Sequence, residues 1–111
     1  MYIIWAKRNI VDIYETMGLA NCEVTLCFCR QETFVRELQA QQYTTKDILV
    51  ICENKAQRIL KILRAITVEH LPKAIVVITE DPANIWLSKR IPEYLHKLLT
   101  LTTEPEHVKF V

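Results

Sequence analysis

Four cysteines, Cys22, Cys27, Cys29 and Cys52, are the residues of this chain that could carry covalent chemistry. Cys52 ends an apolar run, where a thiolate would be desolvated; its pKa would rise and the thiol would be inert. Cys27 and Cys29 are two apart in a strand-like segment and would point to the same face. No pair has Cys-x-x-Cys spacing and no histidine lies nearby in sequence. We expect buried free thiols and no metal or cofactor, with a metal site and redox chemistry as the alternatives.

A second group of residues has the chemistry for holding an anion. Thr79 ends another apolar run and Lys89 follows it, while Lys7 and Arg8 come directly after the first apolar run of the chain. In open parallel sheets, ligands bind in the crevice at the carboxyl ends of the strands. The simpler interpretation is a threonine that ends a strand and a solvated lysine; an anionic small molecule is the alternative.

Two further patterns concern the surface. Lys55, Arg58, Lys61 and Arg64 recur every three residues and form a basic stripe along a predicted helix. A solvated outer face is the default for such a stripe, although it could also contact phosphates or an acidic partner.

Tryptophans are the other candidates for contact with a partner. Trp5 and Trp86 would ordinarily pack in or around the core of so small a domain. If Trp86 is exposed, it becomes an interface anchor, because tryptophan is enriched in binding hot spots. We place Tyr94 with it as a candidate interface residue, and we assign no residue a catalytic role.

Composition limits the classes of protein that fit. The 111 residues suffice for one domain, and 14 basic against 13 acidic side chains give a formal net charge of +1, which provides no general attraction for nucleic acid or an anionic membrane. The longest apolar runs are far shorter than the roughly 20 residues that cross a bilayer, and the start lacks the pattern of a signal peptide. We expect a cytoplasmic protein that binds no membrane.

The elements that must position these residues alternate between strand and helix. Strands are predicted over 2–6, 22–29, 48–52, 74–79 and 85–88; helices over 10–17, ended by Gly18, over 31–42, from a cap at Asn54 through Ile66, and from Pro92 through Leu99. The intervals favour right-handed crossovers, and therefore a doubly wound α/β fold with a five-stranded parallel sheet. We expect one domain over 1–103, with 104–111 as a tail or the start of a linker.

Over residues 1–101 this order resembles the receiver domain of bacterial response regulators, a flavodoxin-like three-layer sandwich. The run Asp47–Cys52 is similar to the family's third strand, which ends in the phosphorylated aspartate. The run Ala74–Thr79 is similar to its fourth strand, which ends in the switch hydroxyl. The run Ile85–Lys89 is similar to its fifth strand, which ends in the lysine that pairs with the phosphoryl group.

The departures from the family pattern concern its chemistry. Cys52 stands at the acceptor position, and Trp5 and Ala6 stand where the resemblance implies two magnesium-binding acids. A hard cation requires oxygen ligands, and phosphoryl transfer requires the metal. Only nine residues separate Thr79 from Lys89, so the fourth helix is predicted to be shortened or lost.

The sequence thus predicts a receiver-like regulatory domain that is not an enzyme and cannot be phosphorylated. It would act by dimerisation or by binding a partner protein, as the N-terminal part of a bacterial transcription regulator, with DNA contacted only through another domain. One alternative is a sensor of an anionic small molecule at Lys7, Arg8, Thr79 and Lys89. A further alternative is a thiol enzyme or a phosphocysteine carrier.

Overall fold

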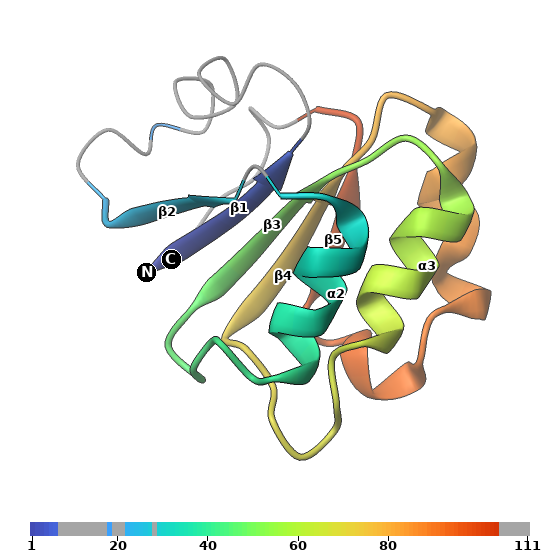
Figure 1. The fold of residues 1–111 in the computed structure, drawn as a ribbon. Helices are drawn as coiled ribbons and strands as arrows, with labels where there is room; N and C mark the ends of the chain where they lie inside the picture. The colour runs from blue at the N-terminus through green and yellow to red at the C-terminus, as the bar shows by residue number, and fades with distance from the viewer. Residues whose placement is uncertain (7–17, 19–21, 28, 105–111) are drawn as a thin grey trace.

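A five-stranded parallel sheet forms the centre of the protein in the computed structural model, which describes residues 1–6, 18, 22–27 and 29–104 (Figure 1). The strands are β1 (Tyr2–Ala6), β2 (Val24–Cys27), β3 (Ile48–Cys52), β4 (Ala74–Ile78) and β5 (Leu99–Thr102). Their order is β2-β1-β3-β4-β5, and every neighbouring pair is parallel. This order confirms the predicted flavodoxin-like α/β fold.

The central strands are buried on both faces. Leu49, Val50 and Ile51 of β3 are 0% exposed although successive side chains point to opposite sides of the sheet. A strand covered on both faces requires a continuous apolar run rather than an alternating one. The continuous apolar runs that predicted β3 and β4 therefore reflect the burial of both faces of these strands.

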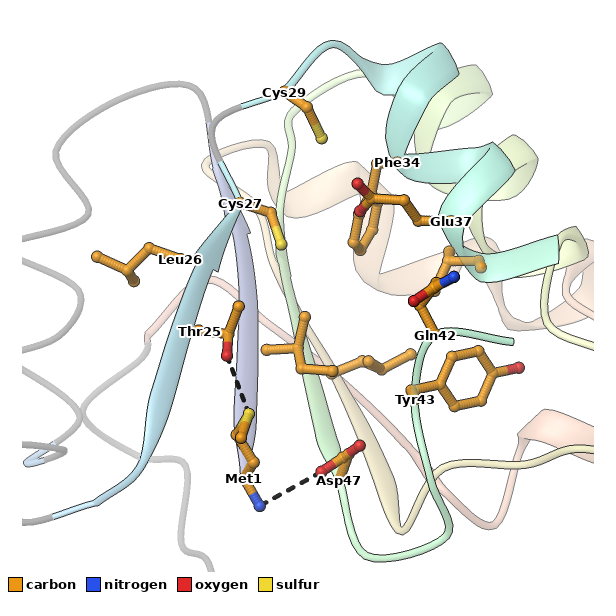
Figure 2. A pocket seen from close by; sticks show the side chains of 13 residues that line it. Met1, Thr25, Leu26, Cys27, Cys29, Phe34, Glu37, Gln42, Tyr43 and Asp47 are labelled. Atoms are coloured by element: carbon orange, nitrogen blue, oxygen red, sulfur yellow. Dashed lines mark hydrogen bonds and ion pairs between the residues drawn. The ribbon is translucent and has the colours of Figure 1, made fainter. Parts of the chain in front are cut away.

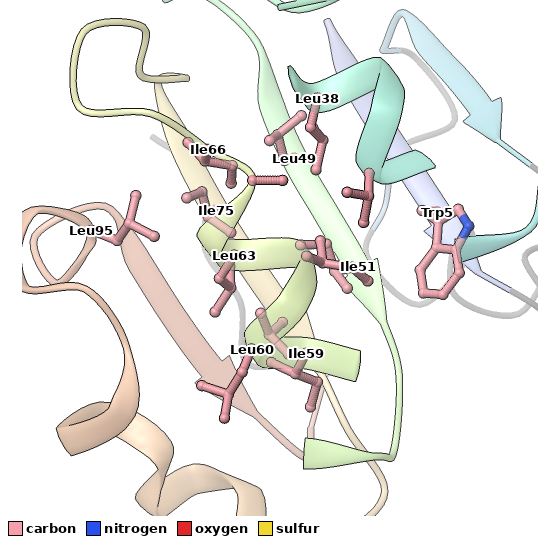
Figure 3. Close-up of a cluster of buried hydrophobic side chains, with 14 of the residues drawn as sticks. Trp5, Leu38, Leu49, Ile51, Ile59, Leu60, Leu63, Ile66, Ile75 and Leu95 are labelled. Atoms are coloured by element: carbon pink, nitrogen blue, oxygen red, sulfur yellow. The ribbon is translucent and has the colours of Figure 1, made fainter. Parts of the chain in front are cut away.

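One face of the sheet packs against α2 (Gln31–Gln39) and α3 (Ala56–Arg64), and we call it the helix-covered face. Figure 3 shows its core, in which apolar side chains of the strands meet those of both helices. The buried positions of α3, namely Ile59, Leu60, Ile62 and Leu63, have the i, i+1, i+3, i+4 spacing of a helix that buries one side. The sequence predicted both helices, although α2 ends three residues earlier than expected.

The opposite face, which we call the second face, has its own buried cluster. It consists of Ile4, Ile48, Val50, Val76 and Ile78. The helix that the sequence predicts over residues 10–17 lies outside the described residues. Gly18, predicted to end that helix, has a φ of 65°, a left-handed conformation that glycine adopts at low cost.

The connection between β4 and β5 differs from the prediction. Residues 85–88 form no strand but belong to the 3₁₀ helix η1 (Pro82–Arg90). Asp81 caps η1 by accepting a hydrogen bond from the Ala83 amide at 3.0 Å, and Pro82 occupies the first turn, where its missing N–H costs nothing. The connection is thus longer than the interval from Thr79 to Lys89 predicted, because Lys89 lies on η1 and the fifth strand begins only at Leu99.

The fifth strand instead lies further along the chain. The helix predicted from Pro92 is reduced to the single turn η2 (Glu93–Leu95), and β5 follows it and pairs with β4. Leu99 and Leu101 pack against the core of the helix-covered face, while Thr100 between them is exposed. The alternation of leucine and threonine is that of an edge strand rather than of a helix.

Candidate functional site

The carboxyl ends of β1, β3 and β4 meet at one edge of the sheet, where an open α/β sheet usually binds its ligand. Ala6 lies beside Cys52, and Cys52 lies beside Ile78. The Cys52 side chain packs against the buried cluster of the second face. This burial raises the pKa of the thiol to about 12, so the thiol stays protonated at neutral pH and is a poor nucleophile.

The position before Ala6 is filled by an indole that belongs to the core. Trp5 is 0% exposed, stacks on Phe34 with ring centroids 5.5 Å apart, and donates its Nε1 hydrogen to the Cys29 carbonyl at 2.9 Å. Ala6 is 2% exposed. Neither side chain offers an oxygen ligand, and the described residues contain no group of three or more His, Cys, Asp or Glu that could hold a metal ion.

Glu53 follows Cys52 but turns toward α3. Its carboxylate forms an ion pair with Arg58 at 3.3 Å and accepts a hydrogen bond from the Asn54 amide at 3.2 Å. The side chain is 8% exposed. Glu53 therefore secures the start of α3 and does not take the place of an acceptor aspartate.

A network of hydrogen bonds joins the loops that follow β3 and β4. Asn84 of η1 donates its Nδ2 hydrogens to the Asn54 carbonyl at 2.7 Å and to Thr79 Oγ1 at 2.9 Å. Asn54 in turn donates to the Glu80 carboxylate and accepts from the Glu80 amide at 2.8 Å. Asn54 was predicted to cap α3, but Lys55 occupies the N-cap without a side-chain bond. These polar groups are thus satisfied internally.

The predicted anion-binding residues are not brought together in the described part of the chain. Thr79 is 1% exposed, and its hydroxyl accepts hydrogen bonds from Asn84 and from the Asp81 amide. Lys89 is exposed on η1 instead of ending a strand, because the segment that carries it is helical. Lys7 and Arg8 lie outside the described residues. Glu80 and Asp81, which follow β4, place two acidic side chains in the loop next to Thr79.

The basic stripe divides into two roles. Arg58 is partly buried and pairs with Glu53, so it belongs to the fold. Lys55, Lys61 and Arg64 are exposed along α3, away from its buried side. These three agree with the default interpretation of a solvated outer face.

The most distinctive surface feature is on η1. Trp86 is 82% exposed and Ile85 is 37% exposed, whereas Leu87, which follows them, is 7% exposed. Tyr94 is also partly exposed, but its hydroxyl donates to the Ile66 carbonyl at 2.5 Å and ties η2 to the end of α3. Trp86 is therefore the candidate interface residue, and Tyr94 serves mainly to hold the fold.

A pocket that the sequence did not predict lies between β2 and α2 (Figure 2). Its volume is about 790 Å³, and it contains both Cys27 and Cys29. The available signal was the two-residue spacing of these cysteines, which predicted that they share a face but not that the face borders a pocket.

Comparisons with family models, with curated proteins and with solved structures found no match to this chain. Within the part of the chain that the structure describes, no helix has the length and apolar character needed to cross a bilayer. The geometry of the sheet edge, of η1 and of the pocket is therefore the basis for any function.

Proposed function

We propose that this chain is a receiver-like regulatory domain that is not phosphorylated and acts by binding another protein through the η1 surface, defined by Ile85, Trp86 and Lys89. The observation that carries the proposal is the 82% exposure of Trp86. A tryptophan left in water gains free energy when a partner covers it, and such residues anchor interfaces.

The scaffold behind Trp86 supports this role. Side chains three residues apart lie in line on a 3₁₀ helix, so Asn84 and Leu87 form the buried row of η1. Asn84 bonds to the two neighbouring loops, and Leu87 packs into the core. Trp86 is thus presented from a fixed backbone, which lowers the entropy cost of binding.

The charges on η1 indicate the chemistry of the partner. Lys89 lies three residues after Trp86, in the same exposed row, and Arg90 follows it. Neither cation takes part in an ion pair with the described residues. A partner that offers an apolar pocket beside acidic side chains would complement this surface. A symmetric contact between two copies would instead bring cations together, so a different protein is favoured over self-association.

The sheet edge supports the absence of phosphoryl transfer. The acceptor position holds a partly buried thiol with a pKa raised to about 12, and the expected metal positions hold Trp5 and Ala6. The same pKa argues against a thiol enzyme or a phosphocysteine carrier. The engaged hydroxyl of Thr79 argues against the anion sensor.

The assignment as the regulatory part of a bacterial transcription regulator rests on the likeness to receivers alone. In that arrangement, DNA would be contacted by a separate output domain, and partner binding at η1 would control it.

A peptide selection tests the proposal even though the partner is unidentified. A displayed library of short random peptides is selected on the wild-type chain, and the enriched peptides are titrated by fluorescence polarisation. We expect acidic residues next to aromatic or aliphatic ones, and affinities at least about tenfold weaker for Trp86→Ala and Lys89→Glu. Val68→Ala is the matched control, because Val68 is 53% exposed and lies between α3 and β4.

Equal binding of the enriched peptides to Trp86→Ala and to the wild type would refute the proposal. Light scattering over a range of concentrations tests the choice of partner. A dimer of the wild type that Trp86→Ala abolishes would show that this surface serves self-association and would overturn the assignment to a different protein.

A further inference from the structure

The β2–α2 pocket arises from the way α2 sits on the sheet. α2 packs against α3 and over the central strands, which leaves the helix-covered side of the edge strand β2 partly open. Thr25 of β2, Ile3 of β1 and Leu49 of β3 are neighbours in register and form the floor. At about 790 Å³, the pocket has a size typical of small-molecule sites.

The apolar part of the lining comes from the strands and from α2. Ile3 is partly exposed and provides surface for an aliphatic or aromatic body. Phe34, Leu38 and Leu49 are buried and form the packed wall behind it. Figure 2 shows the thiols of Cys27 and Cys29 along one side, where they add soft apolar contacts.

The charged groups of the lining are the carboxylates of Glu37 and Asp47 and the amino group of Met1. Glu37 of α2 borders the pocket and is half-buried, and none of the ion pairs among the described residues involves it. Burial first, and the Glu37 charge second, raise the pKa of Cys27 to about 11 and raise that of Cys29, which indicates that the carboxylate lies close to both thiols. The second acid, Asp47, is paired with the Met1 amino group at 3.4 Å and accepts from the Thr44 amide at 2.7 Å.

We propose that the β2–α2 pocket binds an apolar molecule that carries a protonated amine, with the body against Ile3, Cys27 and Cys29 and the ammonium group on Glu37. The assignment follows from charge complementarity: the partly desolvated carboxylate of Glu37 lacks a cation among the described residues, and an ammonium group supplies one. A ligand with a carboxylate would meet like charge. This site lies on the helix-covered side of β2 and is separate from the η1 surface.

The test compares three probes of equal length that differ in the head group: hexylammonium, hexanol and hexanoate. Binding is followed by NMR, through the methyl signals of Ile3, Leu38 and Leu49, in the protein labelled at its isoleucine and leucine methyl groups. Hexylammonium should shift these signals saturably and bind at least about tenfold more tightly than hexanol, as expected for one charge-assisted hydrogen bond. Hexanoate should bind more weakly than hexanol.

Variants separate the charge from the cavity. Glu37→Gln should lower the affinity for hexylammonium to that for hexanol and leave the affinity for hexanol unchanged. Glu32→Gln is the matched control, because Glu32 carries the same charge on the first turn of α2, is exposed and does not line the pocket. Thr25→Phe, which fills the floor from the exposed edge strand, should abolish binding of all three probes.

Alkylation by iodoacetamide provides a second readout. Saturating hexylammonium should slow the modification of Cys27 and Cys29 without changing that of the exposed Cys22. Hexanoate binding as tightly as hexylammonium, or an unchanged hexylammonium affinity in Glu37→Gln, would overturn the assignment of the charge. Absence of any saturable methyl shift with all three probes would overturn the pocket as a binding site.

Discussion

Cys52 provides the most quantitative prediction, because its chemistry follows from burial alone. Burial raises the pKa of the thiol from 9.0 to about 12. At about pH 8 an ordinary thiol is roughly one-tenth thiolate, whereas a thiol with a pKa of 12 is thiolate in about one molecule in ten thousand. Since the thiolate is the nucleophile, iodoacetamide should modify Cys52 in the native chain about a thousandfold more slowly than an ordinary thiol, before any steric hindrance is counted.

Peptide mapping by mass spectrometry measures this rate. Native chain is treated with iodoacetamide, samples are quenched over time, and the modified fraction of each cysteine is determined. Cys22 is exposed and serves as the internal reference, and chain unfolded in urea shows that all four thiols can react. Modification of Cys52 within about tenfold of the Cys22 rate would refute the inference that the Cys52 thiol is desolvated and inert.

The same shift makes stability depend on pH in a defined direction. Below pH 9 both the folded and the unfolded chain keep the Cys52 proton, so this thiol contributes no pH dependence. Between pH 9 and about 12 the unfolded chain loses the proton while the folded chain keeps it, and the free energy of unfolding should fall by about 1.4 kcal/mol per pH unit. Urea titrations at several pH values give the free energy of unfolding of the wild type and of Cys52→Ala, and the difference between the two isolates this slope. Free energies that change with pH in parallel for the two proteins would contradict it.

Two further predictions concern the sheet edge. Asn84→Ala removes one buried and one partly buried hydrogen bond and takes this donor away from the Asn54 carbonyl and from Thr79 Oγ1. The free energy of unfolding measured in urea should therefore fall by about 2–3 kcal/mol, against less than about 1 kcal/mol for the exposed Ile85→Ala, and equal losses would contradict the network. Magnesium with beryllium fluoride, a phosphoryl mimic, should leave the amide NMR signals of Cys52 and Thr79 unchanged, because the described edge lacks a metal-binding group; saturable shifts there would show a working receiver site.

The sheet was predictable where burial on both faces dictates the residue types. β3 and β4 are covered on both faces, so their continuous runs of Ile, Val and Leu leave little room for another interpretation. The fifth strand was misplaced because residues 85–88 contain strand-forming types. In the structure, the buried residues Asn84 and Leu87 have the three-residue spacing of a 3₁₀ helix. Two residues are too few for this spacing to be recognised in the sequence.

The alternation of leucine and threonine in β5 was not recognised because leucines just before the strand suggest a helix. Leu95, Leu98 and Leu99 have the spacing of a helix, yet Leu95 belongs to η2 and Leu99 to the strand. A short edge strand gains its stability from pairing with β4, a tertiary contact that local sequence does not express.

At the candidate site, the sequence was informative about the residue types at the strand ends and uninformative about the hydrogen bonds and the pocket. The sequence placed Cys52 at the end of an apolar strand and predicted a raised thiol pKa; the structure gives a raised pKa and a partly buried side chain. The bonds between Asn54 and Glu80 and the β2–α2 pocket depend on which loops and elements lie side by side. That information appears only with the fold.

The most direct test of the η1 surface as the binding site is a map of partner binding on the amide NMR spectrum. The chain, labelled with ¹⁵N, is titrated with the tightest peptide from the displayed library. We predict saturable shifts along η1, centred on Trp86 and Lys89, and unchanged signals for Cys52 and Thr79. Shifts concentrated at Cys52 and Thr79, with Trp86 unaffected, would contradict the claim that this receiver-like scaffold works through the η1 surface instead of its sheet edge.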